Sequence, residues 1–456
     1  MRLVFVLALL LTACDADEPT LPAEPPAGLA APIAYPLSVS EDGRFLVDRT
    51  GAAVLLHGDA AWSLIVNLSL EEARVYLNDR RAKGVNAIYV NLVETAFSNQ
   101  DPPWTNAQGE TPFDPLPDTY VLDFSAPREA YWAHVDAVLA AAAERDILVF
   151  AVPAYMGWMQ QFDGWSYALD ANGAARMRAY GEFLGRRYAD QPNLVWVAGG
   201  DWRADGPSYA VTDEVEAWVE GVRAFDDVHL WTAHGGQESG VDAYGYLGLD
   251  LNTTYRYPPE EVPEAVRADV ARRPRLPVVF FEGWYENEYG VTPAQLRYQA
   301  YTSLLSGAMG QFYGNNPIWA FEDGWEQALD DPGGLDQVHV ARLFRSRPFP
   351  QLVPSDEVVV GDRGDRTDGT FVAAARATSG ATSIVYSPRA EPVTIDLDRA
   401  VGGREARLWC VDPKTGEASD LGTVVSEGRT TVTPCASPDA VFVVDDAAQR
   451  FAAPGS

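Results

Sequence analysis

Basic residues, histidine and cysteine are scarce in this sequence. Its 456 residues include 34 Lys and Arg against 65 Asp and Glu, which gives a formal net charge of −31. Because so acidic a surface repels phosphate groups, we expect no nucleic-acid partner and no docking on anionic lipid. The five His and three Cys form no cluster with zinc-ligand spacing, so we predict no metal and no cofactor. We expect a monomer.

Long apolar runs are missing after the N-terminus, where a transmembrane helix would need about 18 residues. Residues 1–14 have a basic start at Arg2, an apolar run and the ending "LTAC", which is typical of a bacterial lipoprotein signal. We expect cleavage before Cys14 and lipidation of that cysteine; an ordinary secretory signal with an incidental cysteine is the alternative. Residues 15–34 then form a Pro-rich acidic tether. The predicted product is an exported bacterial lipoprotein at the cell envelope or cell surface, with membrane contact only through its lipid anchor.

Lipidation of Cys14 would leave two cysteines, Cys410 and Cys435. Export permits a disulfide between them, and the sequence leaves both a bonded and a free pair open.

Residues 35–350 are predicted to form a (β/α)8 TIM barrel of the α/β class, with a β-hairpin at its N-terminal end. Apolar runs that read as buried strands alternate with segments of helical apolar spacing, which is typical of that fold. The connection between the fifth and sixth runs has no clear helix. Two long connections, residues 94–128 and 155–172, are expected to lack regular structure and to form a binding rim. The runs are "AVLLHGD", "NAIYVNLV", "ILVFAVPAY", "LVWVAGGD", "HLWTAHG", "LDLNTTY", "VVFFEG" and "GAMGQFYG".

Residues 351–446 have short strand-like runs separated by Gly, Asp and Pro turns, which predicts a small antiparallel β-sandwich followed by a tail, 447–456. The segment "DPKTG" in this region favours a β-turn over a calcium loop, because it supplies too few oxygen ligands in register.

Polar and aromatic residues stand where the predicted barrel strands end. The carboxyl ends of barrel strands meet at one mouth, so these side chains should share a pocket. Asp201 and Glu282 are the predicted catalytic pair, since two carboxylates across a sugar are what glycoside hydrolysis needs. Asp205 is a rival to Asp201, and Glu286 and Glu288 are rivals to Glu282. The predicted substrate contacts are Asp59, Trp62, Asn91, Tyr155, Trp202, His234, Tyr255, Trp284 and Tyr313.

Several of these motifs resemble a known family. The run "GRFLVDRTGAAVLLHGDAAW" is similar to the opening of the apiosidase-like glycoside hydrolases, family 140, formerly a domain of unknown function. The likeness continues through "NLVWVAGGD", "VVFFEGWYE" and "GAMGQFYGNNPIW" into "WCVDPKTGE", which resembles the C-terminal domain, described as collagen-binding, that accompanies this barrel. It covers about residues 36–444.

The resemblance implies release of branched sugar units, such as apiose, from pectic side chains. It places the catalytic pair on Asp201 of "GGD" and on Glu282. Two positions depart from the family pattern: the sixth strand reads "LDLNTTYRYPP" where a Gln, Ser or His ending is expected, and Trp202 follows "GGD" where a polar residue is expected.

We therefore expect a glycoside hydrolase of plant-type or pectic branched glycans. Strands four and seven are where retaining barrel glycosidases usually carry their pair, so Glu282 is the predicted nucleophile and Asp201 the acid/base. The alternative is a non-catalytic cell-surface glycan- or matrix-binding lipoprotein. The presence of both Asp201 and Glu282 favours the enzyme, because a barrel that has lost turnover would usually have lost one of the two carboxylates.

The lipoprotein prediction is tested by Cys14→Ser, which should release the protein in soluble form, because a multiply acylated cysteine anchors stably and serine cannot be acylated in this way. The measurement is membrane fractionation with N-terminal sequencing of the mature protein. Wild-type protein that is already soluble and begins elsewhere than at Cys14 would contradict the prediction.

Overall fold

The computed structural model describes residues 31–456. The predicted signal with Cys14, and most of the predicted tether, lie outside the described residues. Among residues 31–456, no helix is both long enough and apolar enough to cross a membrane.

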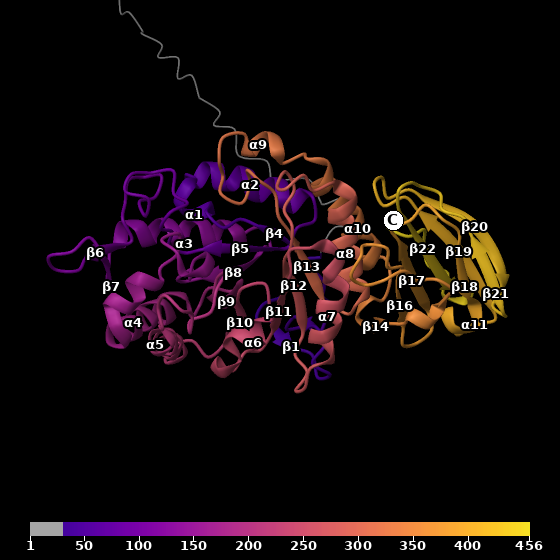
Figure 1. The fold of residues 1–456 in the computed structure, drawn as a ribbon, viewed down its shortest axis with the longest axis horizontal. Coiled ribbons are helices and arrows are strands. Elements are labelled where there is room, and N and C mark those ends of the chain that lie inside the picture. Colours follow the sequence, from indigo (N-terminus) through magenta and orange to yellow (C-terminus); the bar gives the residue numbers. More distant parts are fainter. Residues whose placement is uncertain (1–30) are drawn as a thin grey trace, which may run out of the picture.

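Eight parallel strands form a nearly closed barrel (Figure 1), which confirms the predicted fold class. Their hydrogen-bonded order is β10-β9-β8-β5-β4-β13-β12-β11, and the gap in the barrel lies between β10 and β11. Of their residues only Leu230 is not fully buried, as expected for parallel strands covered on both faces. The strands are β4 (Leu56–Ala60), β5 (Ala87–Asn91), β8 (Leu148–Val152), β9 (Leu194–Gly199), β10 (Leu230–His234), β11 (Asn252–Tyr255), β12 (Val278–Glu282) and β13 (Gly310–Tyr313).

Helices surround this sheet, and two of them begin at capping boxes. Ser69 pairs with Glu72 at the start of α2, and Thr292 pairs with Gln295 at the start of α8, so two backbone N–H groups at each helix start find an acceptor. The unit without a clear helix in the sequence holds the short α6 and η2. The helices are α1 (Leu64–Asn67), α2 (Leu70–Ala82), α3 (Glu129–Ala143), η1 (Trp158–Gln160), α4 (Ser166–Tyr188), α5 (Thr212–Arg223), α6 (Gly240–Tyr244), η2 (Gly245–Leu247), η3 (Pro259–Glu261), α7 (Val262–Ala271), α8 (Pro293–Leu305), α9 (Trp325–Ala328) and α10 (Pro332–Arg345).

Two small antiparallel sheets flank the barrel. The N-terminal segment forms three short strands, β1 (Ser38–Val39), β2 (Leu46–Val47) and β3 (Ala53–Val54), where the sequence predicted a two-stranded hairpin. In the long connection after β5, β6 (Phe113–Pro115) pairs with β7 (Leu122–Pro127) in a hairpin that projects from the barrel (Figure 1). The expectation that this connection lacks regular structure was therefore wrong; Phe113 and Phe124 stack at 4.5 Å and give the hairpin an apolar anchor.

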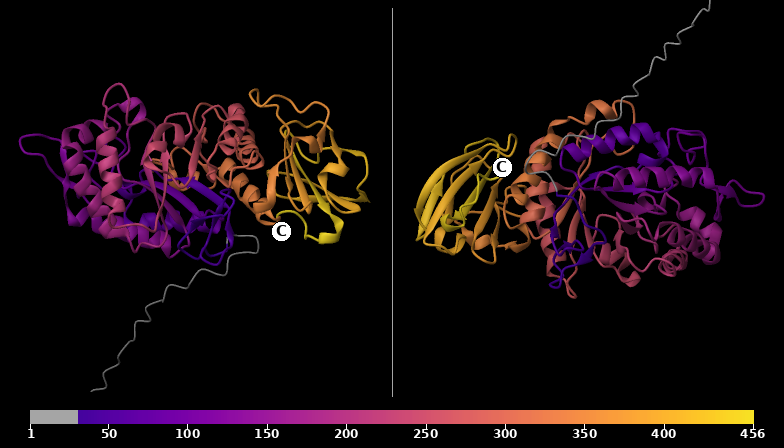
Figure 2. Two further views of the ribbon diagram at one scale, coloured as in Figure 1. Left: turned by 90° about the horizontal axis from the view of Figure 1, so that it is seen from below. Right: turned by 180° about the vertical axis from the view of Figure 1, so that it is seen from behind.

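The C-terminal region forms two antiparallel sheets, as the sequence predicted. One has six strands in the order β14-β16-β17-β22-β19-β20, and the other has three in the order β15-β18-β21. This domain lies beside the barrel, against α8 and α10 (Figure 2). Its elements are η4 (Phe349–Gln351), β14 (Leu352–Pro354), η5 (Asp356–Val358), β15 (Val359–Val360), β16 (Ala373–Ala377), β17 (Thr382–Ser387), β18 (Val393–Asp396), α11 (Leu397–Ala400), β19 (Glu405–Val411), β20 (Ala418–Val425), β21 (Arg429–Val432), β22 (Ala440–Asp446) and η6 (Ala447–Gln449).

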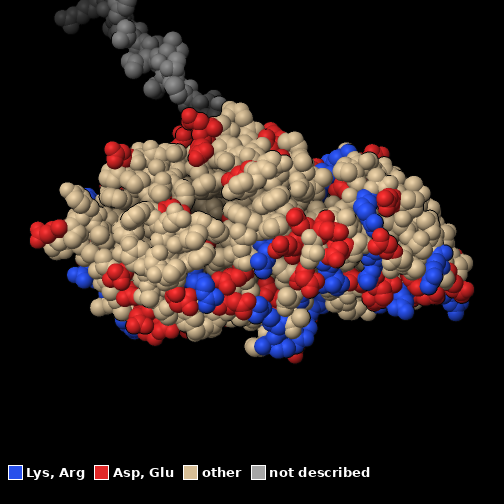
Figure 3. Space-filling model, in the orientation of Figure 1, with Lys and Arg blue, Asp and Glu red and all other residues tan. Residues whose placement is uncertain are grey.

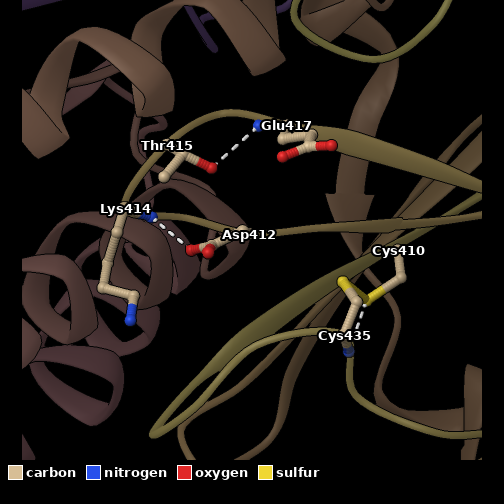
Figure 4. Close-up of a disulfide and its surroundings, with 6 residues drawn as sticks. All are labelled: Cys410, Asp412, Lys414, Thr415, Glu417 and Cys435. Atoms are coloured by element: carbon tan, nitrogen blue, oxygen red, sulfur yellow. Dashed lines mark hydrogen bonds between the residues drawn. A yellow bond between two sulfur atoms is a disulfide. The ribbon is translucent and has the colours of Figure 1, made fainter.

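A disulfide joins Cys410 on β19 to Cys435 (Figure 4). In the chain-entropy account, a closed loop of 25 residues contributes about 3 kcal/mol. The nearby "DPKTG" segment is a turn between β19 and β20, in which the Asp412 carboxylate accepts the Lys414 N–H at 2.9 Å (Figure 4).

The two domains share one core. Tyr301 of α8 stacks on Tyr386 of β17 with ring centroids 4.8 Å apart, and apolar residues of α8 and α10 pack with those of the six-stranded sheet. The buried Arg297 of α8 contacts Asp336 at 2.6 Å and, across the domain boundary, Asp439 at 2.6 Å. The sandwich thus supports the helix that follows β12. Charged side chains on the face in Figure 3 lie mainly along its lower edge and over the C-terminal domain.

Replacing Arg297 by methionine should destabilise the protein by about 3–5 kcal/mol, because two buried carboxylates lose their partner. The matched control is Arg178→Met, since Arg178 pairs at 2.7 Å with Glu220 on the surface and should contribute less than about 1 kcal/mol. Chemical denaturation measures both free energies of unfolding. Equal, small losses would contradict the shared-core interpretation.

Candidate active site

A pocket of about 460 Å3 opens at the carboxyl ends of the barrel strands. Eight of its fourteen lining residues are aromatic, four are carboxylates, and none is Lys or Arg. The lining residues are Trp62, Asn91, Phe97, Tyr155, Trp158, Asp163, Asp201, Gln237, Tyr257, Glu282, Tyr285, Glu288, Tyr289 and Trp319.

Asp201 is delivered by a sharp turn after β9. Three successive residues have left-handed backbone angles: Gly199 at φ +88°, Gly200 at +118° and Asp201 at +52°. A Cβ on Gly199 would lie 2.2 Å from the His234 carbonyl oxygen, and one on Gly200 would lie 2.4 Å from the Tyr155 ring. The two glycines are therefore required by backbone angle and by space. A non-glycine residue held at positive φ, as Asp201 is, is a frequent mark of functional sites.

Glu282 is the last residue of β12, and its side chain is only 3% exposed. Its Oε2 lies 2.6 Å from Nε2 of His234, although the two atoms do not meet in hydrogen-bond geometry. An apolar strand can end in this glutamate because polar groups lie beside the carboxylate at the barrel mouth.

His234 ends β10 and is fully buried between the two carboxyls. Its Nδ1 accepts the backbone N–H of Asp201 at 2.9 Å, so the ring proton is on Nε2. Donor atoms of Asp201, His234 and Glu282 all lie within 4.8 Å of one another, which is close enough for a cation. However, a metal ligand at Nε2 must be deprotonated, and the proton of the neutral ring would then lie on Nδ1, directed at the Asp201 N–H. The Nε2–H tautomer that the N–H of Asp201 imposes therefore disfavours a metal centre.

Burial raises the pKa of both carboxyls. The pKa of Asp201 rises to about 7 through burial and the nearby charge of Glu282, and the pKa of Glu282 rises to about 8 through burial. The Tyr155 hydroxyl donates to Oδ2 of Asp201 at 2.5 Å. Burial lowers the pKa of His234 to about 4, so the ring is neutral. Near neutral pH the two carboxyls therefore retain a proton between them.

Five of the eleven residues predicted from strand ends line this pocket: Trp62, Asn91, Tyr155, Asp201 and Glu282. His234 and Tyr255 lie beneath it; their ring centroids are 4.9 Å apart, and His234 contacts the carboxyls rather than the cavity. Trp202 packs edge-on against Trp158 at 5.7 Å, beside the pocket.

The three remaining predicted contacts face away from the pocket, which corrects the sequence interpretation. Asp59 is buried against α2, where Nε of Arg80 lies 2.5 Å from its carboxylate and the Tyr76 hydroxyl donates at 2.8 Å. Tyr313 donates to Glu286 behind β13. Trp284 packs with Tyr313 in a small apolar cluster.

The rival carboxylates have structural partners. Glu286 accepts the backbone N–H groups of Gly333 and Gly334 at 2.8 and 3.1 Å, which places it at the start of α10. Asp205 pairs with Arg203 at 2.9 Å. Glu288 lines the pocket but is held at its rim by the Trp319 N–H at 3.2 Å.

Sequence reasoning missed most of the pocket wall that comes from loops. Phe97, Trp158 and Asp163 belong to the two long connections that the sequence marked as a binding rim, so composition gave a partial signal. Tyr285 and Trp319 lie in motifs shared with the apiosidase-like family, and Tyr257 lies in the sixth-strand run that departs from it, but none of the three was predicted as a site residue. No sequence signal marked Gln237 and Tyr289.

Comparison with known proteins decides the family. Residues 40–351 match the family described as "Apiosidase-like, catalytic domain". The chain belongs to the apiosidase-like family. Residues 353–445 match a second family, described as "Putative collagen-binding domain of a collagenase".

Solved structures similar to this chain are described as glycoside hydrolases. A protein described as a glycoside hydrolase is 26% identical, with 90% of this chain and 97% of that chain covered and a TM-score of 0.77. A glycoside hydrolase family 5 protein from Bacteroides vulgatus ATCC 8482 is also 26% identical, with 90% and 94% covered and a TM-score of 0.77. No curated protein sequence matches the chain. This apiosidase-like protein is thus a glycosidase.

Replacing either buried carboxyl by its amide, Asp201→Asn or Glu282→Gln, should raise the melting temperature at alkaline pH. A raised pKa means that the folded protein keeps a proton which the unfolded chain loses above about pH 4. Its stabilising effect is full below that pH and is lost as the pH rises through about 7 for Asp201 and about 8 for Glu282.

Because the amides do not titrate, the difference in melting temperature between variant and wild type should grow from about pH 5 to about pH 9. Differential scanning calorimetry measures it, with Glu71→Gln on the exposed face of α2 as the control. A difference that does not change with pH would show that neither carboxyl is protonated by burial.

Proposed function

We propose that this apiosidase-like protein is a retaining glycosidase that releases branched sugar units from plant-type or pectic glycans, with Glu282 as nucleophile and Asp201 as acid/base. The observation that carries the proposal is that carboxylate oxygens of Asp201 and Glu282 lie within 4.8 Å of each other at one pocket. Retaining pairs are about 5–5.5 Å apart, whereas inverting pairs need about 6.5–9.5 Å to admit a water.

The reaction follows in two steps. Asp201 gives its proton to the glycosidic oxygen while Glu282 attacks the anomeric carbon, so the glycosidic bond breaks and a glycosyl ester forms on Glu282. The Asp201 carboxylate then takes a proton from water, which attacks the same carbon and releases the sugar with its original anomeric configuration. Both carboxyls return to their starting protonation states.

The protonation of the pair sets what the first step requires. The pKa of Glu282, about 8, is higher than that of Asp201, about 7, so without substrate the retained proton lies more on Glu282. The proposed roles need that proton on Asp201, so we place its transfer to Asp201 at substrate binding. The Tyr155 hydroxyl, which donates to Oδ2 of Asp201 at 2.5 Å, keeps the Asp201 carboxyl in place for it.

The pocket wall supports a sugar without a negative charge. Four carboxylates and no cation line the cavity, so a uronate would meet like charges and find no ionic partner. Rings such as Trp62, Trp158 and Trp319 offer apolar faces suited to the C–H faces of a sugar. The apiosidase-like family name is consistent with a branched, neutral unit.

A binding role without turnover is the second candidate, and the C-terminal family match is what favours it. A binding protein would need the aromatic walls but not a pair of closely spaced, proton-holding carboxyls. The kinetic test below separates the two functions.

Glu282→Gln should abolish hydrolysis of every substrate while leaving the fold and sugar binding intact. Asp201→Asn should slow substrates with poor leaving groups most, because a good aryl leaving group needs little protonation. General acid catalysis contributes about 100- to 10,000-fold, which sets the expected loss on natural linkages. Steady-state kinetics on pectic oligosaccharides and aryl glycosides measures both effects, and NMR of the first-formed product reads the anomer.

Glu288→Gln is the matched control, since Glu288 lines the same pocket but has no assigned chemical step. It should retain kcat within about tenfold and change mainly KM. Near-normal turnover in Glu282→Gln would remove the assignment and promote the binding role, and an inverted product anomer would remove the retaining mechanism.

A further inference from the structure

His234 is the residue that touches both members of the proposed pair. It is fully buried, and its ring is enclosed by Tyr255 at 4.9 Å, Phe281 at 5.3 Å and Trp62 at 5.6 Å between centroids. Two of these neighbours, Tyr255 and Phe281, are barrel-strand residues, so the ring has little freedom to rotate. Of the polar atoms in the described residues, the ring nitrogens meet the Asp201 backbone N–H at 2.9 Å and carboxylate oxygens of Asp201 and Glu282 at 3.8 and 2.6 Å.

One side of His234 fastens the strained turn that carries Asp201. Its carbonyl oxygen accepts the Gly200 N–H at 2.7 Å, and its Nδ1 accepts the Asp201 N–H at 2.9 Å. Left-handed angles at three successive residues are costly for the aspartate and persist only where surrounding contacts hold them. His234 accepts both of these hydrogen bonds, and together they hold the turn in its left-handed conformation.

The other side of His234 faces Glu282. Because Nδ1 is occupied as an acceptor, Nε2 carries the proton, and it lies 2.6 Å from Oε2 of Glu282. The two atoms do not meet in hydrogen-bond geometry, but both are buried and neither has another hydrogen-bond partner among the described residues. The backbone N–H of one catalytic residue therefore sets the tautomer that places an unpaired donor beside an unpaired acceptor of the other, and a hydrogen bond completed there would favour the ionised carboxylate.

We propose that His234 is a positioning residue that couples the two carboxyls: its Nδ1 fixes the turn that aims Asp201, and its Nε2–H stabilises the charge on Glu282. This rests on the proposed function for its chemical meaning, and it adds a role that neither carboxyl has alone. The competing explanation is that His234 only fills space beneath the pocket.

Two substitutions separate the two sides of the ring. In His234→Asn the shorter amide can accept the Asp201 N–H where Nδ1 stood but does not reach Glu282. In His234→Gln the longer amide can donate to Glu282 where Nε2 stood but leaves the Asp201 N–H without its acceptor. Each variant thus keeps one contact and loses the other.

The Asn variant should move the acidic limb of the kcat/KM profile to higher pH, since Glu282 without its donor becomes harder to ionise. The titratable groups that face the ring are Asp201 after β9, Glu282 on β12 and Tyr255 on β11; its other ring neighbours, Trp62 and Phe281, do not titrate. The ratio of rates on poor and good leaving groups should stay near the wild-type value.

The Gln variant should lose on the order of 100-fold in kcat on a poor leaving group, because displacement of a catalytic group by about 1 Å costs that much. It should lose much less on an aryl glycoside with a good leaving group, and its acidic limb should stay in place. Equal losses on both leaving groups in both variants, with unmoved pH limbs, would leave only a space-filling role and overturn the proposal.

A measurement on the wild-type protein keeps the proposal testable if either variant fails to fold. NMR of 15N-histidine-labelled protein should show one of the five histidines as a neutral Nε2–H tautomer throughout the active pH range. The signal that is present in the wild type and missing from the spectrum of folded His234→Asn belongs to His234.

If no histidine shows that tautomer, the proposed coupling fails even though the glycosidase function can stand. If the tautomer is present but Glu282→Gln still turns over substrate, the proposed catalytic pair fails instead.

Discussion

The organisation of the site depends on two carboxyl groups that share one largely buried pocket. Their oxygens lie within 4.8 Å of each other, and two charges so close and so poorly solvated repel each other strongly. The pair relieves this by keeping a proton, and retaining glycoside hydrolysis needs one protonated and one ionised carboxyl. The same constraint that makes the site costly to fold therefore prepares it for chemistry.

Several parts of the fold hold this pair in place. The strained "GGD" turn brings Asp201 in from β9, and β12 brings in Glu282. His234, at the end of β10, contacts both. The C-terminal sandwich contributes from farther away. Its Asp439 pairs with Arg297 on α8, and α8 is the helix that follows β12, the strand that ends in Glu282. We therefore interpret the sandwich as a support for the barrel wall as well as a separate domain.

The barrel and its catalytic pair could be predicted because alternating buried strands and strand-end carboxylates are local patterns. Which way a strand-end side chain points is not local. Asp59 and Tyr313 are register partners on neighbouring strands, and both turn toward the helices, where Arg80 and Glu286 satisfy them. Their strand-end positions suggested substrate contacts, yet an inward or outward direction depends on partners far away in sequence. The aromatic wall was missed for a related reason: rings such as Tyr257 and Trp319 reach the pocket only through loop conformations.

The most direct test is to trap the glycosyl-enzyme with a 2-fluoro glycoside of the sugar that the wild type hydrolyses, followed by peptide mass spectrometry. A fluorine beside the anomeric carbon slows the second step, so the ester accumulates. The account predicts one adduct on the peptide that contains Glu282, and a longer-lived adduct in Asp201→Asn, where water is not activated. An adduct on Glu288 or another carboxylate, or inactivation without any adduct, would contradict the assignment of Glu282 as the nucleophile.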